Sequence, residues 1–313
     1  MLFRSWGHPP VWVLFFAQIT FGFTMALFWP SFGGLMPAII EEKDLQKANS
    51  TLQFVANLAI ILGTAVGGFI VATLGSTLAL FIDACTYLIC GAVVYTMRKL
   101  VPPSKSESTM WDDLIHGWKV FLSFRWIAVI VGAFTFIVMV WAGAEQVLGP
   151  KIALQYFDGA KSWAQVLACE TAGFVVGSLL GMRIRPKYPM RFMMIVTFAS
   201  TFYIYFMSIH LSIWLIALGA FFVGVMLDLW GAIWGTALQK EVPREALSRV
   251  SAFDAFGSVL LRPVGLIIAA PMAEWIGVTR TLEIFAGVSV VAIVASLVVP
   301  DVWKMQLTES SKL

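Results

Sequence analysis

The chain has 313 residues, of which 59% are hydrophobic and 12% charged. Soluble domains carry about 25% charged residues, so this composition excludes a water-soluble fold. The net charge of +3 requires no nucleic-acid partner, because the distribution of Lys and Arg between the apolar segments accounts for it.

Nine apolar segments are long enough to cross a bilayer, since a hydrocarbon core of about 30 Å needs about 20 helical residues. They are Val11–Ile40, Thr51–Thr73, Ser76–Met97, Trp126–Leu148, Ser162–Met182, Phe192–Ile209, Ser212–Leu238, Val250–Ala273 and Thr281–Pro300. The sequence therefore predicts an all-α polytopic membrane protein with nine transmembrane helices.

Basic residues alternate between the two sides of this arrangement. Most of the 21 Lys and Arg residues fall in connections on one side, whereas the opposite connections hold only Arg4, Lys151, Lys161 and Arg280. Short loops rich in Lys and Arg stay in the cytoplasm. We therefore expect a multi-pass protein of the cell membrane with a cytoplasmic C-terminus and residue 1 on the outer side.

Two regions of the chain align with each other at one constant offset, so that Leu45 matches Leu247 and Gly63 matches Gly265. The first three segments then correspond to the last three. Many transporters are built from two six-helix halves in parallel repeat. The odd number of helices and this repeat together lead us to expect helices four to twelve of a twelve-helix protein, without the first three.

Three domains are expected from this organisation. Residues 1–100 form an incomplete N-terminal bundle of three helices, residues 101–125 a cytoplasmic linker, and residues 126–313 a six-helix C-terminal bundle. The second part of the linker reads TMWDDLIHGWKVFLSF and predicts an amphipathic helix on the membrane surface. Its apolar face comprises Trp111, Leu114, Ile115, Trp118, Phe121 and Leu122.

Several segments resemble the major facilitator superfamily, in the branch of bacterial exporters that includes enterobactin and macrolide efflux proteins. They are LMPAIIEEKDLQKANSTLQ, GTAVGGFIVATLG, LFIDACTYL, TALQKEVPREALSRVSAFDAFGS and RPVGLIIAAPMAEWIGV. The resemblance covers Trp12 to Trp303. It implies proton-driven export of a small hydrophobic or amphipathic molecule by the rocking of two bundles, in a monomer surrounded by lipid.

The chain departs from the family pattern in two places. The signature loop between helices two and three has no counterpart, and its pseudo-repeat after Gly181 reads MRIRPKYPMR without the usual acidic residue. The antiporter-type motif has Gly63, Gly67 and Gly68, but Thr64 where proline is common. These glycines are expected to permit close helix contact, whereas the antiporter assignment stays open.

Three ionisable residues are expected near the middle of the membrane. At about 1.5 Å per helical residue, Glu170, Asp228 and Arg262 lie roughly 16–18 Å from the cytoplasmic boundary. We hypothesise that Arg262 pairs with one carboxylate and that the other carries a transported proton. The alternative is a static ion network that only fixes the register of the helices.

Other charged residues are weaker candidates. Asp83 lies on a polar face of a helix that the resemblance makes peripheral. Glu145 is expected near the outer boundary, either solvated at the interface or part of an outer gate. Asp254 is expected near the cytoplasmic end, where it caps a helix or pairs with a base such as Arg249.

The first segment carries Gln18, Met25 and Trp29 on one helical face. The resemblance makes this helix part of the cavity wall, and a wall of Met and aromatic side chains suits apolar substrates. The alternative is that the face serves only to pack helices together.

The sequence contains no metal-ligand cluster, nucleophile triad or phosphate-binding loop. We therefore expect neither an enzyme nor an ATP-driven pump, and no cofactor. The leading hypothesis is a secondary transporter that exports small molecules. The alternatives are a truncated, non-transporting membrane protein from a partial gene or misassigned start, and a subunit completed by another chain.

Overall fold

The computed structural model describes residues 11–97 and 110–307, and every regular element in these two ranges is helical. The expected position of residue 1 and the first part of the linker fall outside this range. The helices are α1 (Val11–Ile39), η2 (Glu42–Asp44), α2 (Leu45–Leu74), α3 (Ser76–Met97), α4 (Met110–Ser123), α5 (Arg125–Ala142), η3 (Gly143–Leu148), α6 (Gly149–Tyr156), α7 (Ala160–Gly181), α8 (Pro189–Val196), α9 (Phe198–Ser208), α10 (Ile213–Glu241), α11 (Arg244–Val259), α12 (Arg262–Ile276), α13 (Val278–Leu297) and α14 (Pro300–Trp303).

Eight stretches of helix in the described residues are long and apolar enough to cross a membrane. They correspond to the last eight of the nine expected segments. The first expected segment forms one continuous helix, α1. Its apolar part, Phe15–Met25, is shorter than the eight stretches that could cross a membrane. The all-α polytopic membrane fold is therefore confirmed.

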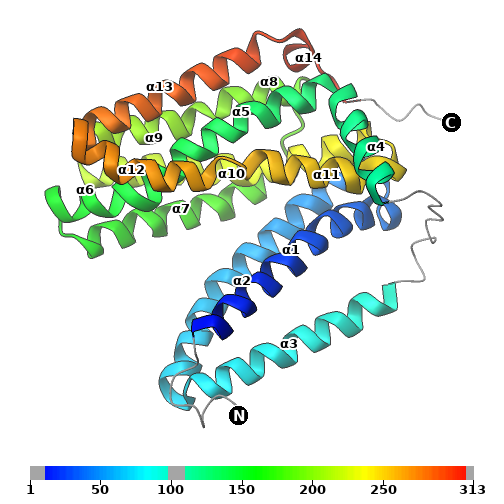
Figure 1. The fold of residues 1–313 in the computed structure, drawn as a ribbon, viewed down its shortest axis with the longest axis horizontal. Helices are drawn as coiled ribbons and strands as arrows, with labels where there is room; N and C mark the ends of the chain where they lie inside the picture. Colours follow the sequence, from blue (N-terminus) through cyan, green and yellow to red (C-terminus); the bar gives the residue numbers. More distant parts are fainter. Residues whose placement is uncertain (1–10, 98–109, 308–313) are drawn as a thin grey trace.

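The helices from α5 to α13 form one bundle, and α1 to α3 lie along its side (Figure 1). Helix α2 packs against α7 and α10, and α1 packs mainly against α11. We call the end where α2 begins and α10 finishes the closed end. From there α1 and α2 diverge from the bundle toward the opposite end, which we call the open end, and α3 lies apart from the bundle, beyond α1 and α2 (Figure 1).

Helices α7 and α10 cross at glycines. A Cβ atom added to Gly173 would lie 2.1 Å from the carbonyl oxygen of Phe221, and one added to Gly224 would lie 2.1 Å from that of Glu170. Small residues allow two helix backbones to approach this closely in a membrane protein. The glycines of α7 and α10 at this crossing therefore form a surface for close helix contact.

The segment expected as one helix from Val250 to Ala273 is divided into α11 and α12. Pro263 lies in the first turn of α12 and cannot donate a hydrogen bond to the carbonyl of Val259. Arg262 is therefore the first residue of a new helix. The face that Arg262 presents is therefore not set by the register of α11.

Helix α5 continues through η3 into α6, so that one helical stretch runs from Arg125 to Tyr156. The η3 segment is a single turn of π-helix. Such wider turns add a residue to the helical repeat and often occur at functional sites. The turn changes the direction in which Glu145 points relative to a regular α-helix.

The expected amphipathic linker helix is present as α4, and it packs on α11. The ring centroid of Trp118 lies 5.3 Å from that of Phe253, and a Cβ on Gly117 would lie 2.9 Å from the Cβ of Arg249. Phe121 is buried at this contact. Helix α4 is thus attached to the closed end of the bundle.

Candidate functional site

Three buried carboxyl groups lie within the C-terminal bundle. The exposed fractions of Glu145, Glu170 and Asp228 are 6%, 5% and 8%. They come from η3, α7 and α10 respectively. Burying an ionisable group costs free energy unless partners compensate, so the partners of each carboxyl group indicate what it does.

Asp228 is held by side chains from α2. Asn57 donates a hydrogen bond of 2.6 Å from Nδ2 to Oδ2 of Asp228. Gln53 donates from Nε2 to Oδ1 at 3.2 Å, in the amide orientation that also lets Oε1 accept from the N–H of Ala232 at 2.7 Å. Two amides of one helix therefore solvate a carboxylate of the opposite bundle.

Further amides on the same face of α2 contact α7 and α10. Gln46 donates from Nε2 to the carbonyl oxygen of Gly181 at 2.8 Å and also to that of Ile184. Asn49 donates to Oγ1 of Thr236 at 3.1 Å and to Oε1 of Gln239 at 2.8 Å. Because hydrogen bonds can be exchanged for bonds to water, such an interface is suited to opening and closing.

We call Gln46, Asn49, Gln53 and Asn57 the α2 polar face. The sequence interpretation missed it, although a signal was present: the four amides are spaced three or four residues apart, which places them on one side of a helix. The partners come from residues 135 to 190 positions later in the chain. Only the packing of the two bundles identifies those partners.

The side chains of Glu145 and Glu170 lie within hydrogen-bonding reach of each other. The indole nitrogen of Trp141 lies beside Glu145. With the geometry found, however, Oε2 of Glu145, Oε1 of Glu170 and Nε1 of Trp141 are buried without a hydrogen-bond partner. The expected location of Glu145 in the solvated outer interface is thus wrong, because the π-turn directs it into the bundle.

The expected ion pair of Arg262 with Glu170 or Asp228 is not formed. Within the described residues, the ion pairs are Lys43–Glu41, Arg125–Asp301 and Lys240–Glu42. Arg262 is exposed at the break between α11 and α12. Its charge instead acts on the carboxyl group of Glu145.

Asp254 accepts hydrogen bonds from two neighbouring side chains. Trp234 donates from Nε1 to Oδ2 at 2.8 Å, and Ser258 donates to Oδ1 at 3.2 Å. The indole comes from α10, so this bond ties α10 to α11.

The remaining candidates lie on the N-terminal helices, away from these carboxyl groups. Asp83 is exposed on α3, and Gln18 is exposed and Met25 half-buried on α1. The side chain of Trp29 lies outside the part of the chain that the structure describes. None of the described side chains in this group contacts Glu170 or Asp228.

The glycine motif on α2 makes no close contact in this structure. No atom lies within 4 Å of a Cβ added to Gly63, Gly67 or Gly68. The close helix contact expected for the motif is thus not made among the described residues. The glycines that do allow helices to touch are those at the crossing of α7 and α10.

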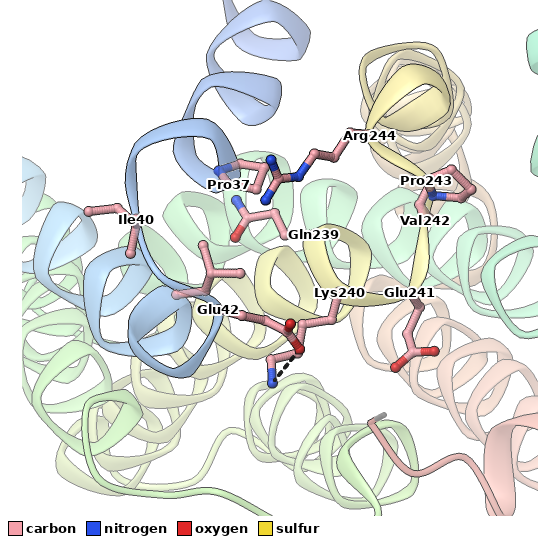
Figure 2. A pocket seen from close by; sticks show the side chains of 10 residues that line it. Pro37, Ile40, Glu42, Gln239, Lys240, Glu241, Val242, Pro243 and Arg244 are labelled. Carbon is pink, nitrogen blue, oxygen red and sulfur yellow. Dashed lines mark ion pairs between the residues drawn. The ribbon is translucent and has the colours of Figure 1, made fainter. Parts of the chain in front are cut away.

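A pocket of about 350 Å³ opens at the closed end, between the end of α1, η2 and the junction of α10 with α11. Figure 2 shows Pro37, Gln239 and Arg244 around it, together with the ion pair of 3.4 Å between Lys240 and Glu42. Charged side chains line this pocket, which makes it a poor site for an apolar molecule. Among the described residues, no cluster of three His, Cys, Asp or Glu is placed to hold a metal ion.

This chain is similar in sequence to one family profile and to known efflux proteins. A family profile described as Major Facilitator Superfamily matches residues 1–266. Multidrug efflux pump Tap of Mycolicibacterium fortuitum is 24% identical over 250 residues, which are 76% of this chain and 59% of Tap. Macrolide efflux protein A of Streptococcus pyogenes is 23% identical over 286 residues, 87% of this chain and 68% of that protein.

The chain thus spans between about half and two thirds of the length of the relatives it matches. The profile covers most of the chain, including α1 to α11, and the helical membrane fold agrees with it. The chain therefore belongs to the major facilitator superfamily, a family of multi-pass transporters of the cell membrane.

Proposed function

We propose that this protein exports a small hydrophobic or amphipathic molecule, coupled to the movement of protons, by alternating access between its two groups of helices. The closed end faces the cytoplasm in this proposal, because the connections rich in Lys and Arg lie there. The arrangement then corresponds to a state that is closed toward the cytoplasm and open toward the outside.

The observation that carries the proposal is the contact of Asp228 with the α2 polar face. The bonds from Asn57 and Gln53 join the two groups of helices about halfway along α2 and α10, on the side of the open end from the bonds of Gln46 and Asn49. Beyond them α2 diverges from the bundle toward the open end (Figure 1). A contact of this kind breaks when the closed end opens. Rigid-body rocking of two bundles is how alternating access works in this type of fold.

The buried carboxyl groups supply sites for protons. Glu170 and Asp228 each lose most of their contact with water, so each gains by protonation when its partners are withdrawn. In this proposal Arg262 provides a positive charge beside Glu145. Asp83 remains a secondary candidate for proton movement.

The names of the relatives support the substrate class. Tap is a multidrug efflux pump and the streptococcal protein is a macrolide efflux protein. Gln18, Met25 and Trp29 on α1 are our candidates for the wall that binds an apolar substrate. Their adaptable side chains suit substrates of varied shape.

Inverted membrane vesicles that contain the protein provide the test, with ethidium and a macrolide as probes. We expect a pH gradient, acidic inside, to drive probe accumulation that a protonophore abolishes. Glu170→Gln should remove this accumulation while the amount of protein in the membrane is unchanged. Accumulation driven equally well without a pH gradient, or none with either probe, would contradict the proposal.

A further inference from the structure

Four buried polar atoms without a hydrogen-bond partner belong to neighbouring groups of the C-terminal bundle that act on one another electrostatically. They are Nε1 of Trp141, Oε2 of Glu145, Oε1 of Glu170 and the hydroxyl of Tyr203. Tyr203 on α9 is completely buried, with an exposed fraction of 0%. Buried polar groups nearly always have a hydrogen-bond partner. A cluster of buried groups that lack one therefore indicates a site that binds a further species.

These groups come from four helical segments, α5, η3, α7 and α9. The hydroxyl of Tyr203 is within electrostatic reach of both Glu145 and Glu170. The other described groups that act on the two carboxyl groups are Trp141 and the charge of Arg262 on α12. The cluster therefore contains two acids, two neutral hydrogen-bond donors and one nearby positive charge.

Two carboxyl groups within hydrogen-bonding reach require a proton between them. An ionised carboxylate is only an acceptor, so two of them have no donor with which to form a bond. In a medium of low dielectric constant, two negative charges at this separation repel strongly. One proton turns this repulsion into a short, charge-assisted hydrogen bond.

We propose that Glu145 and Glu170 together form a single proton-binding site, which holds one proton between the two carboxyl groups and is completed by the hydroxyl of Tyr203. Its role in transport rests on the proposed function, whereas the existence of the site does not. The partner of Glu170 is thus a second acid from the π-turn of η3. The sequence predicts a basic partner, Arg262, at this place.

The unpartnered donors show how the site releases its proton. When the proton leaves for water on the open side, the pair carries two negative charges. The N–H of Trp141 and the O–H of Tyr203 can then each donate to a carboxylate oxygen, and Arg262 supplies the opposing charge. The same donors are free while the proton is bound, which explains why the structure leaves them unsatisfied.

Infrared titration of the purified protein in lipid nanodiscs tests the site directly, with the proton itself as the ligand. The variants are Glu145→Gln, Glu170→Gln and the double variant. Glu283→Gln on α13, an exposed glutamate outside the cluster, is the matched control. At neutral pH we expect the signal of one protonated carboxyl group in the wild type to disappear in either single variant.

A shared proton makes the two substitutions non-additive. The double variant should lose no more signal than each single variant, and the control should lose none of it. Additive losses would show two independent carboxyl groups and overturn the proposal. So would a Glu145→Gln variant that titrates like the control.

Labelling of the unmodified protein avoids any effect of the substitutions on folding. A hydrophobic carbodiimide reacts with protonated carboxyl groups inside the membrane, and mass spectrometry locates the product. We expect one label per molecule, on either Glu145 or Glu170. Labels on both residues of the same molecule, or on neither, contradict a single shared proton.

Transport assays with the single variants distinguish a failure of this inference from a failure of the proposed function. If the wild type shows proton-driven accumulation that Glu170→Gln abolishes and Glu145→Gln does not, the paired site is wrong and the proposed function stands. If infrared titration finds the shared proton but no probe is transported, the function is wrong and the site stands. Tyr203→Phe should keep the shared proton and change the pH profile of transport.

Discussion

The side-chain amide of Asn57 on α2 donates a hydrogen bond of 2.6 Å to the carboxylate of Asp228 on α10. The two residues are 171 positions apart in the chain. Their bond joins the two groups of helices, so it can form only when α2 and α10 are packed together. On the same face of α2, Gln46 bonds to the carbonyl of Gly181 at the end of α7, and Asn49 bonds to Gln239 near the end of α10.

Asn57→Ala should favour opening of the closed end, because Asp228 loses a donor that only the closed arrangement provides. A hydrogen bond to a charged group contributes about 1.5–3 kcal/mol, so the ratio of closed to open molecules should fall roughly tenfold or more. Pulsed electron paramagnetic resonance with spin labels at Glu41 and Glu245 measures this as longer distances.

Thr64→Ala is the control for this experiment. Thr64 lies on α2, and its hydroxyl bonds only to the carbonyl of Ile60 in its own helix. Its removal should leave the distances unchanged. Equal distributions for Asn57→Ala and the wild type would show that the bond does not hold the closed end.

The ion pair between Lys240 and Glu42 should contribute much less than the bond of Asn57. The side chains are 17% and 43% exposed, and pairs near water are weak because solvent and salt screen them. Glu42→Gln should therefore shift the same equilibrium by less than about 1 kcal/mol. A double-mutant cycle with Lys240→Gln, repeated at high salt, should show this coupling vanish.

Gly224→Ala should destabilise the protein, because its Cβ would lie 2.1 Å from the carbonyl oxygen of Glu170. Overpacking of this kind costs about 1–3 kcal/mol. Gly68→Ala is the matched variant, since nothing lies within 4 Å of a Cβ there, and it should be neutral or stabilising by up to about 1 kcal/mol. Thermal unfolding in detergent distinguishes the two variants. Equal unfolding midpoints would contradict the close contact of α7 with α10 at Gly224.

His210 should make stability depend on pH. It lies in the turn between α9 and α10, with its ring centroid 3.8 Å from that of Tyr156. Burial lowers the pKa of His210 below its usual value. The folded state thus favours the neutral ring, so its contribution to stability is present above the unfolded pKa of about 6.5 and is lost as pH falls below it.

His210→Asn isolates this effect. The backbone φ of His210 is 51°, a left-handed conformation that asparagine adopts readily. The variant should keep the turn and lose part of the decline in thermal midpoint between neutral and mildly acidic pH. A decline as steep as in the wild type would assign the pH dependence to other groups.

The membrane-spanning elements could be predicted from the sequence because each depends on its own composition. Segments such as Ser212–Leu238 and Thr281–Pro300 are apolar over a length that matches the bilayer, and the helices α10 and α13 follow them closely. The amphipathic helix α4 was predictable for the same reason. Periodicity within one segment determines which of its faces is apolar.

The candidate site was predicted only in part. Glu170 and Asp228 are buried as expected, since an acid in the middle of an apolar segment has to lie inside the bundle. Their partners were not predicted correctly. The break before Pro263 places Arg262 away from both acids, and the π-turn brings Glu145 toward Glu170.

The sequence alone determined that this protein lies in the membrane as a set of helices, because the transfer of apolar side chains from water is a local and nearly additive property. The tertiary structure decided which polar groups meet. A single π-turn rotates every later side chain, and the glycine crossing of α7 with α10 sets how Asp228 faces α2. Those relationships arise from the rigid packing of several helices at once, and no single segment contains them.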